Sequence, residues 1–174
     1  MGTPVRHRQI QLSVAVEIPQ DHGRGVVPHG IENSRIEAAL AVAQERTTRF
    51  IGATLIPNLK PESFTTATNG MLAGKLSLTL SLDNGIENKQ HKGITDTTGI
   101  RVFFCDPYSS YQKGGVEHAN KMLRRYLPKG CDLSNYTQAQ VDDFVATINR
   151  KPRRCLGYKS ALQLAKEKGI LLVQ

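Results

Sequence analysis

Residues 76–82 alternate apolar and hydroxyl side chains at every position, and Asp83 follows this run directly. Because successive side chains of a β-strand point to opposite faces, the alternation predicts a strand with one buried face. Asn84 and Gly85 come next and are typical turn residues. The sequence therefore places a carboxylate at the end of a strand, and the other strands of its sheet must come from elsewhere in the chain.

The second half of the pattern is a short strand followed by a helix. Residues 101–105 form a β-branched and aromatic run, and residues 116–127 carry apolar side chains at helical spacing. Glu117 falls in the first turn of that helix, and Lys121 and Arg124 follow it at i+4 and i+7 on a second face. An acid that ends a strand is thus separated by 33 residues from an acid that opens a helix.

Two carboxylates presented in this way suit metal-assisted phosphoryl transfer. Mg²⁺ binds a few oxygen ligands while keeping positions open for phosphate and water, and two ions about 3.5 to 4 Å apart can hold both oxygens of an in-line displacement. Each acid also has a plainer interpretation when it is taken singly. Asp83 has the context of an ordinary turn, and Glu117 has that of a surface acid that complements the helix dipole.

A set of linked motifs lies between Leu76 and about Lys168. They are Asp83-Asn84-Gly85-Ile86-Glu87, Phe104-Cys105-Asp106-Pro107-Tyr108-Ser109, Gln112-Lys113-Gly114, Leu123-Arg124-Arg125-Tyr126-Leu127-Pro128-Lys129-Gly130 and Asn149-Arg150-Lys151-Pro152-Arg153-Arg154. Together they resemble the catalytic core of bacterial insertion-sequence transposases of the insertion-sequence-thirty group, in the DDE class with retroviral integrases. The resemblance implies an α/β, RNase H-like mixed sheet flanked by helices. It also implies DNA transposition and integration by strand cleavage and transfer with Mg²⁺ or Mn²⁺.

By that resemblance Asp83 is the second catalytic aspartate of the family and Glu117 is its glutamate, and both are metal ligands. Tyr108, Tyr111 and Gln112 would form a loop over the site, although Ser110 and Tyr111 stand where proline and tryptophan are common in the family. The residues that the resemblance assigns to DNA contact are Lys113, Lys121, Arg124, Arg150, Lys151, Arg153 and Arg154.

The N-terminal region departs from the family pattern, and only residues 10–18 could form a short strand there. The family's first catalytic aspartate corresponds to a position near Val26, which carries no acid. Asp21 could be a substitute, but each residue of displacement along a strand moves a ligand by roughly 3.3 Å. We therefore expect an irregular, truncated or degenerate segment over 1–33, an integrase-like core with C-terminal helices over 34–174, and a chain that is inactive.

The chain has a formal net charge of +8, and residues 113–174 supply most of it, with twelve Lys or Arg against five Asp or Glu. A basic balance of this kind is typical of a partner with a phosphate backbone, although ribosomal and membrane-surface proteins share it. There is no apolar run of the roughly 18 residues that a membrane span needs and no signal-peptide pattern, so the sequence predicts a cytoplasmic, nucleoid-associated protein. Three cysteines without a close pair predict free thiols.

Two other functions stay open on the sequence alone. The chain could be a non-catalytic DNA-binding or dimerising fragment that associates with itself or with an intact transposase. It could also be an RNase H-like nuclease acting on another substrate.

Four further elements are predicted from local patterns. A hairpin is favoured over one helix for residues 38–55, because residues 47–51 rise into a strand pattern. Helices are predicted from Pro61 to about Leu72, from Gln138 to Asn149 behind the N-cap Thr137, and from Ala161 to Lys168 behind the N-cap Ser160.

Overall fold

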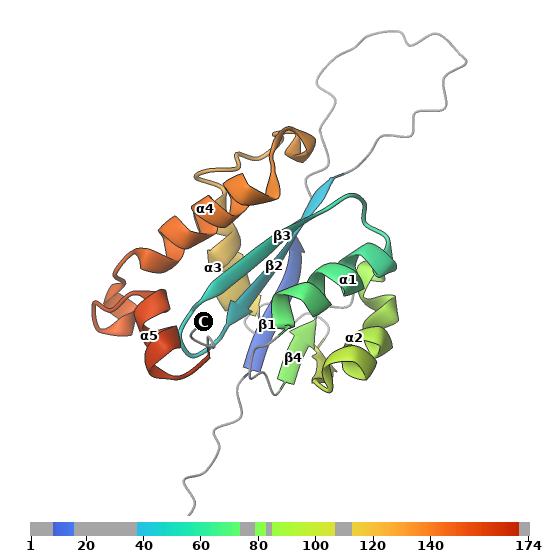
Figure 1. The fold of residues 1–174 in the computed structure, drawn as a ribbon, viewed down its shortest axis with the longest axis horizontal. Coiled ribbons are helices and arrows are strands. Elements are labelled where there is room, and N and C mark those ends of the chain that lie inside the picture. Colours follow the sequence, from blue (N-terminus) through green and yellow to red (C-terminus); the bar gives the residue numbers. More distant parts are fainter. Residues whose placement is uncertain (1–8, 16–37, 74–78, 83–84, 107–112, 171–174) are drawn as a thin grey trace, which may run out of the picture.

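The computed structural model describes residues 9–15, 38–73, 79–82, 85–106 and 113–170, and they form a sheet with helices on both faces (Figure 1). The strands are β1 (Gln9–Ala15), β2 (Ala39–Glu45), β3 (Ile51–Ile56), β4 (Thr79–Leu82) and β5 (Arg101–Phe104). The helices are α1 (Pro61–Leu72), α2 (His91–Thr98), α3 (Gly114–Leu123), α4 (Gln138–Arg150) and α5 (Ala161–Glu167). Short 3₁₀ turns are η1 (Ile86–Gln90), η3 (Leu133–Asn135) and η4 (Arg154–Leu156).

The sheet is mixed, with the strand order β3-β2-β1-β4-β5. β1 pairs antiparallel with β2, and β2 pairs antiparallel with β3 through the predicted hairpin. β1 and β4, and then β4 and β5, run parallel, which requires the crossover connections that α1 and α2 provide. The predicted α/β fold with a mixed sheet is thus confirmed.

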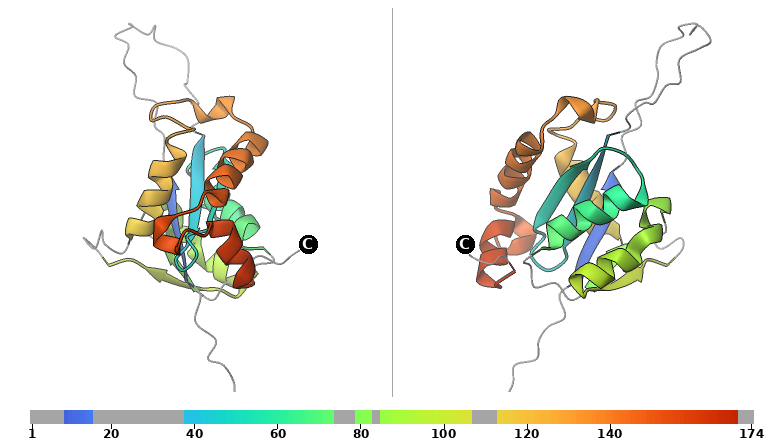
Figure 2. Two further views of the ribbon diagram at one scale, coloured as in Figure 1. Left: turned by 90° about the vertical axis from the view of Figure 1, so that its left-hand side faces the viewer. Right: turned by 45° about the vertical axis from the view of Figure 1, so that its right-hand side comes forward.

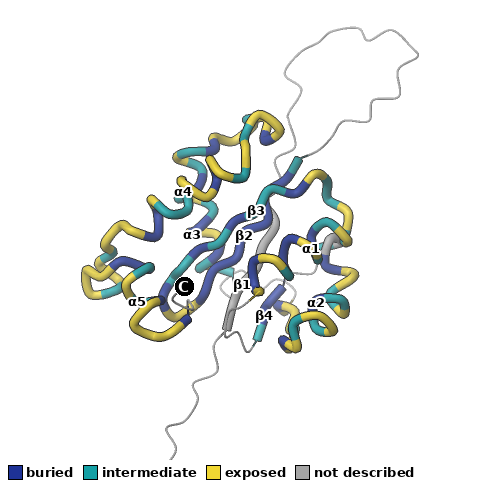
Figure 3. Tube along the Cα trace, viewed as in Figure 1, coloured by how far each residue is buried: buried dark blue, intermediate teal, exposed yellow. Residues whose placement is uncertain are grey.

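β2 explains why the sheet carries helices on both faces. All of its residues are buried, and β2 is dark blue along its length in Figure 3. Ala39, Ala41 and Ala43 pack with α1 and α2, whereas Leu40 and Val42 pack with α3 and α4. Figure 2 shows the sheet between α3 on one side and the pair α1 and α2 on the other. A strand buried on both faces reads as a continuous apolar run, and residues 39–43 of β2 do so before Gln44 and Glu45.

Most of the predicted elements are confirmed. The hairpin forms instead of a helix, and α1 has the predicted bounds, with Pro61 in its first turn. Thr137 and Ser160 cap α4 and α5, and each completes a capping box with the glutamine three residues later. The hydroxyl of Ser160, for example, accepts a hydrogen bond from the Gln163 N–H at 3.1 Å. Both caps fix the helix starts, and α4 and α5 end within one residue of the prediction.

The predicted helix 116–127 is wrong at its C-terminal end, because α3 stops at Leu123. The N–H of Tyr126 bonds to the carbonyl of Leu123 at 2.9 Å, so the chain tightens to i→i−3 bonds before Pro128. That proline disfavours a helical conformation for the residue before it. The helix α2 was not predicted, since its eight residues bury only Ile94 and carry little apolar periodicity.

The N-terminal region contains a strand at the centre of the sheet. β1 overlaps the residues 10–18 that were predicted as a possible strand, but it begins one residue earlier and ends at Ala15. This strand belongs to the same sheet as the elements after residue 38, so the range 1–33 is not irregular throughout. The predicted boundary between residues 33 and 34 lies in 16–37, outside the described residues, and stays a prediction.

Candidate functional site

The start of α3 carries the first of the predicted site residues. Lys113 is its N-cap residue, Gly114 and Gly115 open the helix, and Glu117 lies in its first turn. Val116, Ala119 and Leu123 are buried against the sheet, as the apolar stripe predicted. Glu117 lies off that stripe and is exposed, with no hydrogen-bond or ion-pair partner among the described residues. Its carboxylate is therefore accessible to a ligand, and none of the described residues holds it in a structural salt bridge.

Asp83 follows the last residue of β4 directly but lies outside the described residues, as do Tyr108, Tyr111 and Gln112. The meeting of Asp83 with Glu117 therefore stays a prediction. The described part of β4 shows which faces of the sheet its side chains occupy. Leu80 and Leu82 are buried in the hydrophobic cluster that includes α1. Ser81, which alternates with them, belongs to the opposite face, where α3 packs.

Acidic side chains are sparse around the described part of this site. β1, the strand beside β4, reads Gln-Ile-Gln-Leu-Ser-Val-Ala and contains no Asp or Glu. Within the described ranges, no group of three or more His, Cys, Asp or Glu is placed to hold a metal ion. Val26 and Asp21, the two positions considered for the first aspartate, both lie outside those ranges.

The predicted DNA-contact residues fall on two segments. Lys121 and Arg124 lie on the C-terminal half of α3 and at its end, and Lys121 is exposed. Arg150 ends α4, and Lys151 and Arg154 are exposed in the segment that follows. Lys151 is directed back to the end of α3, where its Nζ donates to the Tyr126 hydroxyl at 3.1 Å.

Arg153 differs from these exposed cations. It is half-buried, and its guanidinium donates to the carbonyl of Arg49 at 3.3 Å and to that of Ile148 at 3.2 Å. Burial lowers the pKa of the Arg153 guanidinium, Cys155 acts in the opposite direction, and the charge of Arg49 lowers it further. Arg153 therefore ties the segment after α4 to the hairpin between β2 and β3, and it keeps a second cation close by.

A cavity of about 340 Å³ joins the two segments that carry the predicted site. It is lined by the hairpin (Gln44 and Arg49), the start of α3 (Gly114, Gly115 and His118) and the segment after α4 (Arg153 and Cys155). None of these lining residues is acidic. The structure thus brings residues around 115 and 154 to one place, together with a hairpin that the sequence did not assign to a site.

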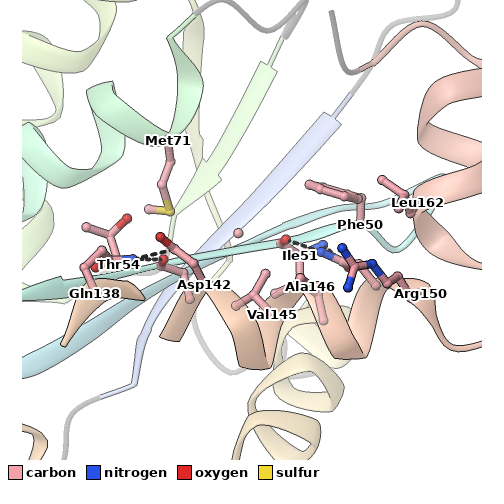
Figure 4. Close-up of a pocket in the computed structure, with 13 residues that line it drawn as sticks. Phe50, Ile51, Thr54, Met71, Gln138, Asp142, Val145, Ala146, Arg150 and Leu162 are labelled. Atoms are coloured by element: carbon pink, nitrogen blue, oxygen red, sulfur yellow. Dashed lines mark hydrogen bonds between the residues drawn. The ribbon is translucent and has the colours of Figure 1, made fainter. Parts of the chain in front are cut away.

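A second cavity, of about 370 Å³, lies between β3 and α4 (Figure 4). β3 is an edge strand, and two amide side chains of α4 bond to its free backbone groups. Asn149 accepts from the Ile51 N–H at 3.0 Å and donates to the Ile51 carbonyl at 2.8 Å. Gln138 accepts from the Leu55 N–H at 2.9 Å and donates to the Ala53 carbonyl at 3.1 Å. These bonds satisfy an edge that would otherwise be open to pairing with another strand.

Sequence reasoning missed Gln44, Arg49, His118 and Cys155 as cavity residues. The contact of Arg153 with Arg49 joins positions 104 residues apart, and no local pattern signals it. One signal was available in principle, because Gln44 is a polar residue directly after the apolar run from Ala38 to Ala43. No helix in the described part of the chain is long and apolar enough to cross a membrane.

The fold is that of a retroviral integrase catalytic core. The catalytic core domain of BIV integrase superposes with a TM-score of 0.66 at 18% identity, covering 92% of this chain and 95% of that one. A chain of the simian T-cell lymphotropic virus intasome in complex with the PP2A regulatory subunit B56 gamma gives a TM-score of 0.67 at 17% identity, covering 91% of this chain and 54% of that one. At these identities the likeness defines the fold alone.

The sequence relatives are transposases of insertion sequences. The chain is 34% identical to the transposase for insertion sequence element IS1086 of Cupriavidus metallidurans over 88% of its length, and 30% identical to the transposase InsI for insertion sequence element IS30A of Escherichia coli K12 over 98%. The chain is therefore a homologue of the IS30-family transposases, and the resemblance seen in the sequence is confirmed. It spans 47% and 44% of the lengths of these two relatives. No protein-family model matches it.

Proposed function

We propose that this chain is the catalytic-core region of a DDE-type transposase that has kept its DNA-binding surface and lost one of the acids needed for strand transfer. The observation that carries the proposal is an integrase-type sheet whose central strand, β1, contains no carboxylate. In the family the first aspartate lies on the strand that begins the core. The 34% and 30% identities to transposases support the DNA-directed part of the proposal.

The register of the sheet supports a shared site for the two remaining acids. Gln44 of β2 pairs with Gln11 of β1, and Gln11 pairs with Ser81 of β4, so the three residues lie in one row. Gln44 lines a cavity with Gly114 at the start of α3, so that helix begins over this row. Glu117 is one turn along α3, and Asp83 is two residues after Ser81 in the sequence.

The donor set is incomplete for two metal ions. Asp83 and Glu117 are the residues that would hold Mg²⁺ or Mn²⁺, whose role when bound is to stabilise the attacking and leaving oxygens of a phosphodiester. A two-ion site needs carboxylates enough to bridge and flank both ions, and β1 supplies none. We therefore assign no strand-transfer step to this chain, and we assign to Lys121 and Arg124 the positioning of a DNA end.

The DNA-binding part rests on exposed charge. Lys121, Arg150, Lys151 and Arg154 are exposed on α3 and on the segment after α4, two segments that the cavity at the start of α3 brings together. Contacts of this kind to phosphates position a protein on the duplex without reading its sequence. The expected partners are DNA and a second copy of this chain or an intact transposase, because the structural likeness includes a chain of an intasome.

Two assays on the purified chain test the proposal. Fluorescence anisotropy with a labelled duplex should show binding that weakens linearly in log Kd against log salt, with a slope set by the number of phosphates contacted. A nicking assay with Mg²⁺ or Mn²⁺ should show no cleavage. Robust cleavage that Asp83→Ala abolishes would refute the claim of inactivity, and absence of binding at low salt would refute the DNA-binding claim.

A gain-of-function variant sharpens the test. Ser13 is two residues beyond Gln11 on β1, as Asp83 is two residues beyond Ser81. Ser13→Asp therefore introduces an acid where the strand register leads to Asp83, a different position from the one near Val26 that the sequence resemblance predicted. Gln9→Asp introduces the same charge on the same strand, four residues earlier, and is the matched control. Metal-dependent nicking by Ser13→Asp, absent from Gln9→Asp and removed by a second change at Glu117, would establish what the strand lacks.

A further inference from the structure

The cavity at the start of α3 has the features of an anion site. It is lined by Arg49, Arg153, His118 and the first residues of a ten-residue helix, and none of its described lining residues is acidic. The first N–H groups of a helix lack partners within the helix, and the helix dipole adds partial positive charge there. A volume of about 340 Å³ leaves ample room for a tetrahedral oxyanion and its water.

An independent observation comes from β2. Gln44 is 1% exposed and lines this cavity, yet its Oε1 atom has no hydrogen-bond partner among the described residues. A buried amide without a partner carries a desolvation cost, and native structures satisfy such groups. Because a side-chain amide can present either its oxygen or its NH₂ group, rotation of Gln44 would offer a donor to an anion in the cavity.

The backbone conformation of Arg49 also bears on the anion site. Arg49 has φ of 59°, in the left-handed region that favours glycine or asparagine over a long side chain. The carbonyl of Arg49 receives the guanidinium of Arg153, so the turn is anchored and the two like charges are kept near each other. Two like charges are thus gathered in one partly buried place, and no described lining residue of the cavity is acidic.

We propose that this cavity binds one phosphate group, held by Arg49, Arg153, the amide of Gln44 and the N–H groups at the start of α3. The phosphate could belong to a DNA backbone or be free in solution, and the shared chemistry is a tetrahedral oxyanion. The DNA source rests on the proposed function, whereas the site itself does not. An occupied cavity would also join the hairpin, α3 and the segment after α4 around one ligand.

The test uses the full chain, inorganic phosphate as the probe, and two variants that each remove one positive charge. Arg49→Gln removes a cavity cation from a turn, and Arg101→Gln removes an exposed cation from β5, which is separated from β2 by β1 and β4. Titration followed by ¹H–¹⁵N NMR at constant ionic strength should show saturable shifts of the Gly114 and Gly115 amides. Arg49→Gln should weaken phosphate binding about tenfold or more, the effect of one charge-assisted hydrogen bond, and Arg101→Gln should leave it unchanged.

The variant Gln44→Met is a second test of the phosphate site, and it changes no charge. This variant should weaken phosphate binding while keeping or raising the melting temperature without phosphate, because it removes an unpaired buried amide. Absence of saturable shifts at Gly114 and Gly115, or equal phosphate affinity in Arg49→Gln and Arg101→Gln, would overturn the site.

A DNA arm distinguishes the two sources. If a short duplex displaces phosphate from Gly114 and Gly115, and Arg49→Gln loses more DNA affinity than Arg101→Gln, the occupant is a backbone phosphate. If phosphate binds as expected and DNA neither displaces it nor discriminates between the variants, the site is one for free phosphate. Loss of DNA binding on Lys121→Gln with intact phosphate binding bears on the proposed function and leaves the cavity assignment in place.

Discussion

Asn149 and Gln138 make matching pairs of hydrogen bonds to the edge strand β3, and they offer a controlled test of how burial sets the value of such bonds. Each amide accepts from one backbone N–H of β3 and donates to one backbone carbonyl, at distances between 2.8 and 3.1 Å. Asn149 is 2% exposed and Ile51, its partner, is 0% exposed. Gln138 is only half-buried. The bonds of the two amides to β3 have similar geometry, but water has easier access to Gln138 than to Asn149.

The magnitudes follow from that difference. Asn149→Ala removes two bonds worth about 1 kcal/mol each and strands the N–H and carbonyl of Ile51 in a buried place, where each unsatisfied group costs about 1–3 kcal/mol. Because the cavity of Figure 4 lies beside Ile51, water can reach part of the site, which sets the expected loss at about 2–4 kcal/mol. Gln138→Ala should cost about 1 kcal/mol, since water replaces its two bonds to β3 and the exposed bond that it donates to Asp142.

Thermal and urea denaturation of the purified variants measure both effects. A loss of about 3 kcal/mol corresponds to a fall of roughly 6–12 °C in Tm for a chain of this size. The two residues are eleven positions apart on α4, about 16 Å along the helix, so the double variant should show the sum of the single losses. A loss in Gln138→Ala equal to that in Asn149→Ala, or a loss below about 1 kcal/mol in the latter, would refute the assignment of cost to burial.

Three further changes test other parts of the structure. Phe64→Ala, at a core side chain that is 1% exposed, should destabilise the chain by about 3–5 kcal/mol in urea denaturation, and a loss near zero would place Phe64 outside the core. Thr137→Ala and Ser160→Ala should each cost about 1 kcal/mol by loss of a capping box, whereas Thr147→Ala, at an exposed position inside α4, should cost less. Arg49→Gly should leave the unfolding free energy unchanged or raise it by up to about 1 kcal/mol, because glycine accepts positive φ, while abolishing phosphate binding at the start of α3.

The sequence predicted those elements whose signals are local. Thr137 and Ser160 are caps recognisable from their own segments, Pro61 marks the first turn of α1, and the alternation before Asp83 marks β4. The central place of β1 could not be read in this way, because it depends on pairing with residues about 30 and 70 positions away. The end of α3 was misjudged because its apolar stripe continues through Tyr126, beyond Leu123, where i→i−3 bonds begin to replace the regular α-helical pattern.

The same contrast between local signals and long-range contacts applies to the candidate site. Glu117 and the exposed cations were found because helix position and charge are visible in the sequence, and family resemblance assigned their roles. The cavity at the start of α3 was not found, because three segments contribute to it and its key contact is a guanidinium–carbonyl bond between Arg153 and Arg49. Arg153 had the same apparent status as Arg150 and Arg154 in the sequence. Only burial separates a cation that holds the fold from cations that face solvent.

The helix α3 carries both the candidate metal ligand and the start of the cavity. Its packing therefore decides what the loss of an acid on β1 would do to the cavity. The buried stripe of Val116, Ala119 and Leu123 fixes α3 on the sheet, and that packing places Glu117 and the cavity residues Gly114 and Gly115 together. None of these contacts involves an acid on β1. A change that removes a metal ligand there leaves the packing of α3 intact, so phosphate contacts can persist after strand transfer is lost. The measurable consequence is that Glu117→Gln should leave the stability of the chain unchanged.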